Sequence, residues 1–517
     1  MTAALQNSVL YRWLLTLWAA LIGWLSNSGL ARLYYGVEGL ILRWVKGSAV
    51  CTFLARPGRL TGAWEGSFTC RAVEWLLNLV PSLLHRLYAP LRPVWEGSLV
   101  FRGVTFLGEN IPLLLSWFFL LMAMFPHTYW NNAFSLGFGI LGVILCYAAA
   151  MRRPALRLIG AVFGPYLWAF FFLLCAGVLK AGVFMTSLRY FTYFFSAILL
   201  ALLTVSTVTH KGQLKRMAAF ASAGIPVATA YALYQRFIVG IKNTSSTVDM
   251  ELNANMPGRV FSFFENPNTF AQVLVMLIPL ALGLMFSSRS FRGKVCAAIA
   301  AGCGVLSIVM TYSRASWIGL VVAIFLFVLL VERRLIPVLI VGAVALLPFL
   351  PASIYNRILT IFDPSDSSTS SRFPIFEVGF KLWKLHPVTG VGLGSELSAS
   401  LAHNSGWYHR LFKFPHYHNI YIQLAVELGT LGVVSYTAGF FSGCKETVRA
   451  LLSPGCDKET RSLIAGCLSG LVGVMVCGLA DYLWHYPRVM VIFWIIFGLM
   501  LCGAKLARQE KQGNGSL

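Results

Sequence analysis

The sequence predicts an all-α fold, a polytopic membrane bundle of about 12 transmembrane helices with a large extracytoplasmic loop and an amphipathic N-terminal region. Of its 517 residues, 57% are apolar and only 12% are charged, whereas soluble domains carry about 25% charged residues. Apolar runs of 16 to 22 residues recur from Ile111 to the C-terminus, and roughly 20 apolar residues cross a bilayer as a helix. These features exclude a soluble globular protein and a disordered chain.

Hydropathy windows indicate twelve candidate spans, all after the first 110 residues. Each span must be helical, because its backbone polar groups have no water to bind inside the bilayer. An even number of spans places both ends of the bundle on the same side. The spans centre on Leu115, Leu141, Phe170, Leu199, Thr229, Leu277, Gly302, Ala323, Val341, Gly429, Val472 and Ile496.

The number of basic residues alternates between high and low from one connection between spans to the next. One set of connections, together with the C-terminal tail, holds 18 Lys and Arg residues, whereas the alternate set, leaving out the long loop, holds 6. The positive-inside rule assigns the first set to the cytoplasm. We therefore expect a multi-pass protein of a bacterial inner membrane with both termini in the cytoplasm. The net charge of +22 then reflects membrane orientation, and no nucleic-acid partner is expected.

The expected organisation has three regions. Residues 1–110 contain many Trp, Tyr and basic residues, and their broken apolar stretches predict amphipathic helices on the cytoplasmic membrane surface. A competing interpretation makes Trp13 to Leu25 a thirteenth span, although this stretch is short. Residues 111–506 form the transmembrane domain, which includes the extracytoplasmic loop 352–417, and residues 507–517 form a cytoplasmic tail.

Polar residues gather at the outer ends of several spans, so we expect the chemistry on the external face. Arginines there most often anchor to lipid headgroups. Arg314, however, lies in a short turn on a face that is depleted of cations, and a guanidinium group suits bidentate binding of phosphate oxygens. The polar residues in question are Arg259, Glu265, Asn266, Asn268, Ser313, Arg314, Arg372, His416, His418, Asn419, Asp481 and His485.

His418 is the leading candidate for proton transfer, because an imidazole with an ordinary pKa of about 6.5 can accept a proton near neutral pH. A structural histidine and a metal ligand are the alternatives, and no second ligand lies at helical spacing. The glycine-rich stretch Gly390–Gly394 could present N–H groups to a phosphate, but a tight turn is favoured. Asp481 is a possible counter-ion for an arginine, and Glu427 is interpreted as structural.

At these residues the chain resembles the O-antigen ligase and O-antigen polymerase superfamily of bacterial envelope glycosyltransferases. The likeness extends over about residues 111–506 and leaves the first 110 residues outside it. Five stretches carry it: Arg259–Asn268 (RVFSFFENPN), Tyr312–Trp317 (YSRASW), Arg372–Trp383, His386–Gly394 (HPVTGVGLG) and His418–Gly429 (HNIYIQLAVELG).

The resemblance implies a metal-independent, inverting transfer of a glycan from an undecaprenyl diphosphate donor to a glycan, lipid or protein acceptor, without a cofactor. By the same resemblance, Arg314 and Arg372 would bind the diphosphate and Arg259 would assist. His418 would activate the acceptor hydroxyl, and Asn419 and Asn268 would be positioning groups. The resemblance does not separate a ligase from a polymerase.

Two functions of other classes remain open. A 12-span bundle is also a common layout for a small-solute transporter, although the two halves show no clear repeat and the polar groups lie at one face. Residues 1–110 could also act as a scaffold that recruits cytoplasmic partners.

Overall fold

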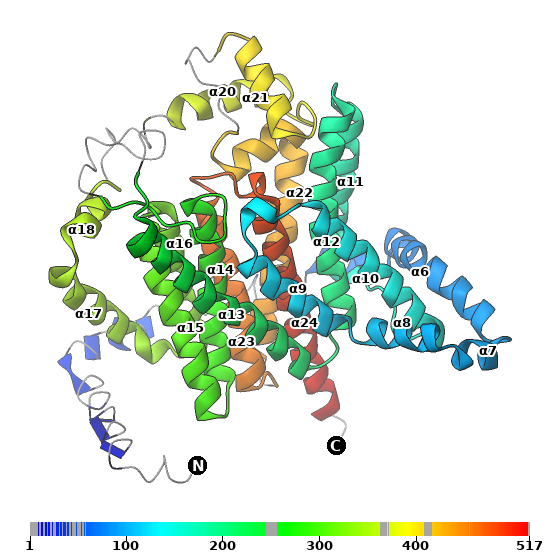
Figure 1. The fold of residues 1–517 in the computed structure, drawn as a ribbon, viewed down its shortest axis with the longest axis horizontal. Coiled ribbons are helices and arrows are strands. Elements are labelled where there is room, and N and C mark those ends of the chain that lie inside the picture. The colour runs from blue at the N-terminus through cyan, green and yellow to red at the C-terminus, as the bar shows by residue number, and fades with distance from the viewer. Residues whose placement is uncertain are drawn as a thin grey trace. The chain divides into compact units, whose positions relative to one another are not determined.

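The structure is a computed structural model of the chain. It describes residues 58–243, 256–361, 370, 372–407, 416–453 and 455–514, with scattered positions before residue 58. All regular elements in these residues are helices, and no strand occurs among them (Figure 1). The predicted all-α class is therefore confirmed.

Ten described helices are long and apolar enough to cross a membrane, and up to 12 spans result if each of two bent helix pairs counts as one. Each of the twelve predicted span centres falls within a helix. The ten are α10 (Ala133–Arg152), α11 (Gly164–Lys180), α12 (Phe184–Thr207), α13 (Lys211–Tyr234), α14 (Pro267–Ser287), α15 (Phe291–Met310), α16 (Arg314–Val331), α22 (Ile420–Leu451), α23 (Lys458–Cys477) and α24 (Pro487–Asn514).

Two of the predicted spans fall on helices that are too short to cross a membrane alone. Each of these helices belongs to one of the two bent pairs. α9 (Ile111–Met124) has 14 residues and follows α8 (Leu99–Glu109) at a bend of 66°. At about 1.5 Å per residue, a helix of that length falls short of a hydrocarbon core of about 30 Å. α17 (Ile336–Leu346) has 11 residues and is followed by α18 (Ala352–Leu359).

Two compact units make up the structure. One consists of Met1–Arg56 and Val328–Leu350 and contains α17; the other consists of Pro57–Phe327 and Pro351–Leu517. The second unit contains all the candidate site residues discussed below. The functional boundary expected at residue 110 stays a prediction, and the alternative span from Trp13 to Leu25 lies largely outside the described residues.

Helices before the bundle carry an apolar surface. α6 (Phe68–Tyr88) is attached by polar side chains: Glu74 accepts a hydrogen bond from the backbone N–H of Ala161 at 2.7 Å, and Asn78 bonds to the backbone of Leu158. Other positions on α6 and α8 expose large apolar side chains, which favours the predicted interfacial location. They are Phe68, Trp75, Leu76, Val80, Leu83, Leu87, Leu99, Val100 and Phe106. The short helices α5 (Arg59–Glu65) and α7 (Arg92–Gly97) flank α6.

The long loop folds onto one end of the second unit. Its helices α20 (Arg372–Leu385) and α21 (Ser395–Asn404) lie at the same end as the start of α22 (Figure 1). The 32-residue α22 is interrupted at Gly429, where φ is 69°. A Cβ at Gly429 would come within 2.2 Å of the carbonyl oxygen of Val388, so the interruption lets the loop approach the helix closely.

Small residues allow α14 and α23 to approach closely in the centre of the second unit. A Cβ added to Gly466 or Gly470 of α23 would come within 2.5 Å of the carbonyl oxygen of Pro279 or Met276 of α14. Such contacts stabilise membrane bundles, where burial of apolar surface from lipid contributes little.

Replacing Gly470 with leucine should therefore destabilise the protein, since the new side chain meets the backbone of α14. We expect the free energy of unfolding to fall by roughly 1–3 kcal/mol or more, measured as a lower unfolding temperature in detergent. Gly302→Leu on α15 is the matched control, because a Cβ at Gly302 has no neighbouring atom within 4 Å. Equal unfolding temperatures for the two variants would contradict this account of the packing.

Candidate functional site

A small cavity of about 90 Å³ lies at the end of the second unit where α16 begins. Five segments that are distant in sequence form its walls: the approach to α14 with its first turns, the turn before α16, α18, the start of α20 and the connection from α23 to α24. The lining residues are Arg259, Asn268, Gln272, Tyr312, Ser313, Arg314, Ala315, Ser316, Arg357, Arg372, Ala480 and Asp481.

Arg259 is buried in the cavity wall, with 9% of the residue exposed. Its Nε donates to the carbonyl oxygen of Thr311 at 2.7 Å, and a terminal nitrogen donates to Oδ1 of Asn268 at 2.6 Å. Burial, together with the positive charges of Arg357 and Arg314, lowers the pKa of Arg259 to about 9. The group is still charged at neutral pH, so the fold keeps a costly buried cation at this place.

Arg314 and Arg357 each donate a hydrogen bond to a backbone carbonyl group. A terminal nitrogen of Arg314 donates to the carbonyl oxygen of Thr360 at 2.6 Å, and Nε of Arg357 donates to that of Tyr312 at 3.4 Å. These bonds connect α18 to the turn before α16. They therefore fix two guanidinium groups beside Arg259.

Basic side chains predominate among the described residues of the cavity wall. Within that part of the chain, four arginines and one aspartate line the cavity. α16 and α20 each begin with a lining arginine, Arg314 and Arg372, and α14 begins next to the lining Asn268. The first turn of a helix also carries a partial positive charge. The arrangement therefore suits an anion with several oxygen atoms.

His418 does not line the cavity itself, but its ring contacts Asp481, which does. Nδ1 of His418 lies 3.3 Å from Oδ1 of Asp481, and the imidazole side chain is 32% exposed. The other carboxylate oxygen accepts a hydrogen bond from Gln272 at 3.0 Å, and Oδ1 also accepts one from the backbone N–H of Tyr482. With Nδ1 directed at a carboxylate, the proton of the neutral ring belongs on Nδ1, and Nε2 is the proton acceptor.

The surroundings keep Asp481 ionised. Burial alone would raise the pKa of this carboxyl, but the hydrogen bond from His418 and electrostatic interactions with the basic groups of His416, His418 and Arg372 hold the pKa well below its usual range. Asp481 therefore presents a fixed negative charge to the His418 imidazole at neutral pH.

Two further histidines pack around this pair. The His416 ring lies 4.2 Å from that of His418 and 4.6 Å from that of His485. Burial, with the nearby charge of His418, lowers the pKa of His416 well below its ordinary value, and burial lowers the pKa of His485. Nδ1 of His416 accepts a hydrogen bond from the backbone N–H of His418 at 3.2 Å. The ligand atoms of His416, His418 and Asp481 lie within 4.8 Å of one another, so these three residues could also hold a metal ion.

Tyr312 and His418 adopt unusual backbone conformations. Their φ values are 52° and 47°, in the left-handed region that non-glycine residues rarely occupy. Such a conformation costs roughly 1–3 kcal/mol and is commonly found at functional sites. Both residues lie where the segments of the candidate site meet.

The structure brings together most of the site residues predicted from the sequence. Arg259, Arg314, Arg372 and Asn268 line the cavity, and His418 adjoins it. Asn419 does not line the cavity; its side chain accepts hydrogen bonds from Tyr421 N and Ile422 N at the start of α22, and its Nδ2 donates to the carbonyl oxygen of Leu479. Asn419 therefore fixes the helix that follows His418.

The glycine-rich stretch forms a tight turn against α22, as favoured from the sequence. Gly390 has a φ of 66°, and a Cβ there would come within 2.4 Å of the backbone of Glu427. The N–H of Gly392 donates to the carbonyl oxygen of Glu427 at 3.0 Å. The buried Glu427 side chain accepts a hydrogen bond from Gln423 at 2.7 Å, consistent with a structural role.

Two polar cavity residues, Arg357 and Gln272, lie outside both the sequence-based candidates and the stretches that carry the resemblance. The available signal for Arg357 was its place among the few basic residues of the long outer loop. Gln272 is a polar residue one turn after Asn268 on α14, and hence on the same helix face. For Asp481, the sequence suggested an arginine partner, whereas its hydrogen bonds run to His418 and Gln272.

Residues 297–437 match the family described as O-antigen ligase, which supports the superfamily predicted from the sequence. The matched segment contains Arg314, Arg357, Arg372 and His418 and excludes Arg259 and Asp481. A search of curated proteins finds no match.

The lowered pKa of Asp481 predicts a pH-dependent contribution to stability. The ionised carboxyl should stabilise the fold above the ordinary aspartate pKa of about 3.9, and this contribution should be lost as the pH falls toward the lower pKa of the folded state. Wild type should therefore unfold at a higher temperature than Asp481→Asn at neutral pH. The difference should shrink as the pH drops below about 4. A difference that stays constant over this pH range would contradict the assignment.

Proposed function

We propose that this protein transfers a glycan from an undecaprenyl diphosphate donor to an acceptor hydroxyl on the extracytoplasmic face of a bacterial inner membrane. The family match supports the broader statement, a membrane glycosyltransferase-like role in surface polysaccharide assembly. The observation that carries the specific proposal is the convergence of four arginines on one cavity beside the His418–Asp481 pair.

The arginines suit the leaving group. A diphosphate ester develops additional negative charge on its bridging oxygen when the bond to the sugar breaks. Arg314, Arg357 and Arg372 would stabilise this charge together with the buried Arg259. The anchoring of Arg259, Arg314 and Arg357 to backbone carbonyl groups supports a role in catalysis, because cations already fixed in position need no reorganisation during the reaction.

His418 would act as the general base through Nε2. The Asp481 carboxylate orients the ring by accepting from Nδ1 and stabilises the imidazolium that forms after proton transfer. In the proposed step, the acceptor oxygen bonds to the anomeric carbon as the bond from that carbon to the diphosphate breaks. The acceptor proton moves to His418, and undecaprenyl diphosphate leaves as the anion. Attack from the face opposite the leaving group inverts the anomeric centre.

Asn268 and Asn419 would be positioning groups. Asn268 accepts from Arg259 and so directs one guanidinium group of the cavity. Asn419 caps α22 directly after His418 and so fixes the backbone that carries the base. Neither role requires contact with the substrate.

The acceptor determines whether the protein is a ligase or a polymerase. A ligase transfers a finished chain to a lipid or protein anchor, whereas a polymerase extends another lipid-linked chain. Loss of a ligase leaves full-length lipid-linked chains, and loss of a polymerase leaves single repeat units. A transporter role is less well supported, because the cavity groups lie near the ends of the long apolar helices, whereas transporters bind their substrates near the membrane midplane.

Arg372→Ala and His418→Ala should each abolish most glycan transfer while leaving the protein inserted and abundant. Removing a group that stabilises charge in the transition state costs about 10²–10³ in rate, and removing a general base costs about 10²–10⁴. The measurement is the amount of surface and lipid-linked glycan in a deletion strain that expresses each variant. Arg189→Ala is the control, because Arg189 is an exposed arginine that pairs with Glu396 and does not line the cavity.

Transfer near wild-type levels in both the Arg372 and His418 variants would reject the proposed roles. Equal loss in the Arg189 control would show that the assay responds to general surface changes instead.

Transfer by the purified protein should persist in EDTA, because four arginines can neutralise a diphosphate without a metal ion. The alternative is a metal ion bound by His416, His418 and Asp481. That alternative predicts activity that is lost in EDTA and restored by one particular divalent cation, and such a result would contradict the metal-independent mechanism.

A further inference from the structure

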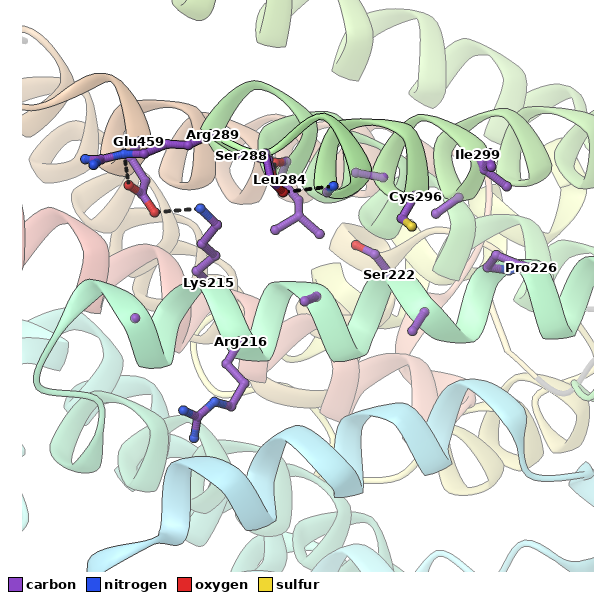
Figure 2. A pocket seen from close by; sticks show the side chains of 17 residues that line it. Lys215, Arg216, Ser222, Pro226, Leu284, Ser288, Arg289, Cys296, Ile299 and Glu459 are labelled. Carbon is purple, nitrogen blue, oxygen red and sulfur yellow. Dashed lines mark hydrogen bonds and ion pairs between the residues drawn. The ribbon is translucent and has the colours of Figure 1, made fainter. Parts of the chain in front are cut away.

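A second and much larger recess lies far along the helices from the arginine cavity. It has a volume of about 950 Å³ and runs between α13 and α15, bordered by the end of α14 and the start of α23 (Figure 2). We call it the α13–α15 groove. Its lining residues on α13 extend from Gly212 to Pro226, and those on α14 and α15 extend from Leu284 to Ala300.

In their other halves, α13 and α15 are joined by hydrogen bonds. There, Oγ1 of Thr229 donates to the carbonyl oxygen of Cys303 at 3.1 Å and accepts a hydrogen bond from Ser307 at 2.8 Å. Toward the start of both helices, the facing side chains are too short to meet across the gap. The short lining residues are Ala219, Ser222, Ala223, Gly293, Ala297 and Ala300.

The walls of the groove suit hydrocarbon. Leu284, Pro226 and Ile299 join the small residues along its length, and Ile299 is 54% exposed. The groove follows two helices that are long and apolar enough to span a membrane. No bulk water is present at that depth in a bilayer, so an acyl chain is the occupant that matches the walls.

One end of the groove suits an anion. Lys215, Arg289 and Glu459 are the charged side chains that meet at this end, among the described residues that line the groove. Nζ of Lys215 lies 2.8 Å from Glu459, and Nε of Arg289 lies 3.8 Å from it, with 88% of the Arg289 side chain exposed. Figure 2 shows Lys215 pointing across the groove to Glu459, while Arg216 points away from the other side of α13.

Helix geometry adds to this positive end. α13, α15 and α23 begin at Lys211, Phe291 and Lys458, so three helix N-termini with their partial positive charges lie at the end that carries the cations. Basic recesses between spans, next to one membrane surface, are typical binding places for anionic lipid headgroups.

We propose that the α13–α15 groove binds an anionic glycerophospholipid. Its phosphate lies near Arg289 and Lys215, and an acyl chain lies along the small-residue walls. This site is separate from the arginine cavity, and the lipid is a resident of the membrane rather than the glycan donor. The inference does not depend on the proposed transfer reaction.

Native mass spectrometry of the full-length protein, released from detergent micelles containing dioleoyl phosphatidylglycerol or dioleoyl phosphatidylcholine, tests this proposal. Wild type should retain phosphatidylglycerol in preference to phosphatidylcholine. Arg289→Gln should weaken retention of phosphatidylglycerol about fivefold, because one basic residue near an anionic headgroup contributes about that factor. The matched control is Arg292→Gln, at the start of the same helix but outside the groove lining.

A second pair of variants tests the acyl-chain wall. Ala223→Phe should fill the groove and remove retention of both lipids, whereas Ala230→Phe should leave retention unchanged. Both alanines are exposed on α13, but only Ala223 lines the groove. The unfolding temperature of each variant is measured in parallel to show that the variant is folded. Arg289→Gln tests lipid binding without altering the acyl-chain wall.

Three outcomes would overturn the proposal. The first is equal retention of phosphatidylglycerol and phosphatidylcholine by wild type. The second is undiminished retention by Ala223→Phe. The third is displacement of phosphatidylglycerol by inorganic phosphate at equal concentration, which would indicate an anion site without an acyl-chain component.

Discussion

The site depends on holding several like charges together at the end of a membrane bundle. Arg259, Arg314 and Arg357 repel one another, and two of the three are almost fully buried. Each is held in place by a hydrogen bond to a backbone carbonyl group. Bringing these guanidinium groups together has an electrostatic cost that a polyanionic ligand would reduce, and this is the physical basis for proposing a diphosphate as the ligand.

The rest of the second unit supports this arrangement. Close packing of α14 against α23 fixes Gln272, on α14, relative to Asp481, which follows α23. The interruption of α22 at Gly429 lets the glycine-rich turn of the long loop pack on the helix that starts after His418. His418, its carboxylate partner Asp481 and the arginines therefore belong to different segments whose relative positions are set by backbone contacts.

Much of the fold was predictable because apolar length is a local property of sequence. Every predicted span centre lies within a helix, but windows of apolar residues could not show that α9 and α17 are short members of bent pairs. The arginines in short turns on the cation-poor face were also identifiable. Arg357 was not, because an arginine on a short loop helix resembles an ordinary surface residue until α18 folds against Tyr312. The pairing of His418 with Asp481, 63 positions apart, likewise depends on tertiary structure.

Equilibrium binding of a polyprenyl diphosphate to the purified protein tests the central claim most directly, with Arg357→Gln compared with wild type and with Arg236→Gln. Arg236 donates to the carbonyl oxygen of Gly258 and does not line the cavity. The account predicts that Arg357→Gln weakens diphosphate binding at least tenfold, about 1.4 kcal/mol, while Arg236→Gln binds as wild type does. Equal affinity of wild type and folded Arg357→Gln for the diphosphate would contradict it.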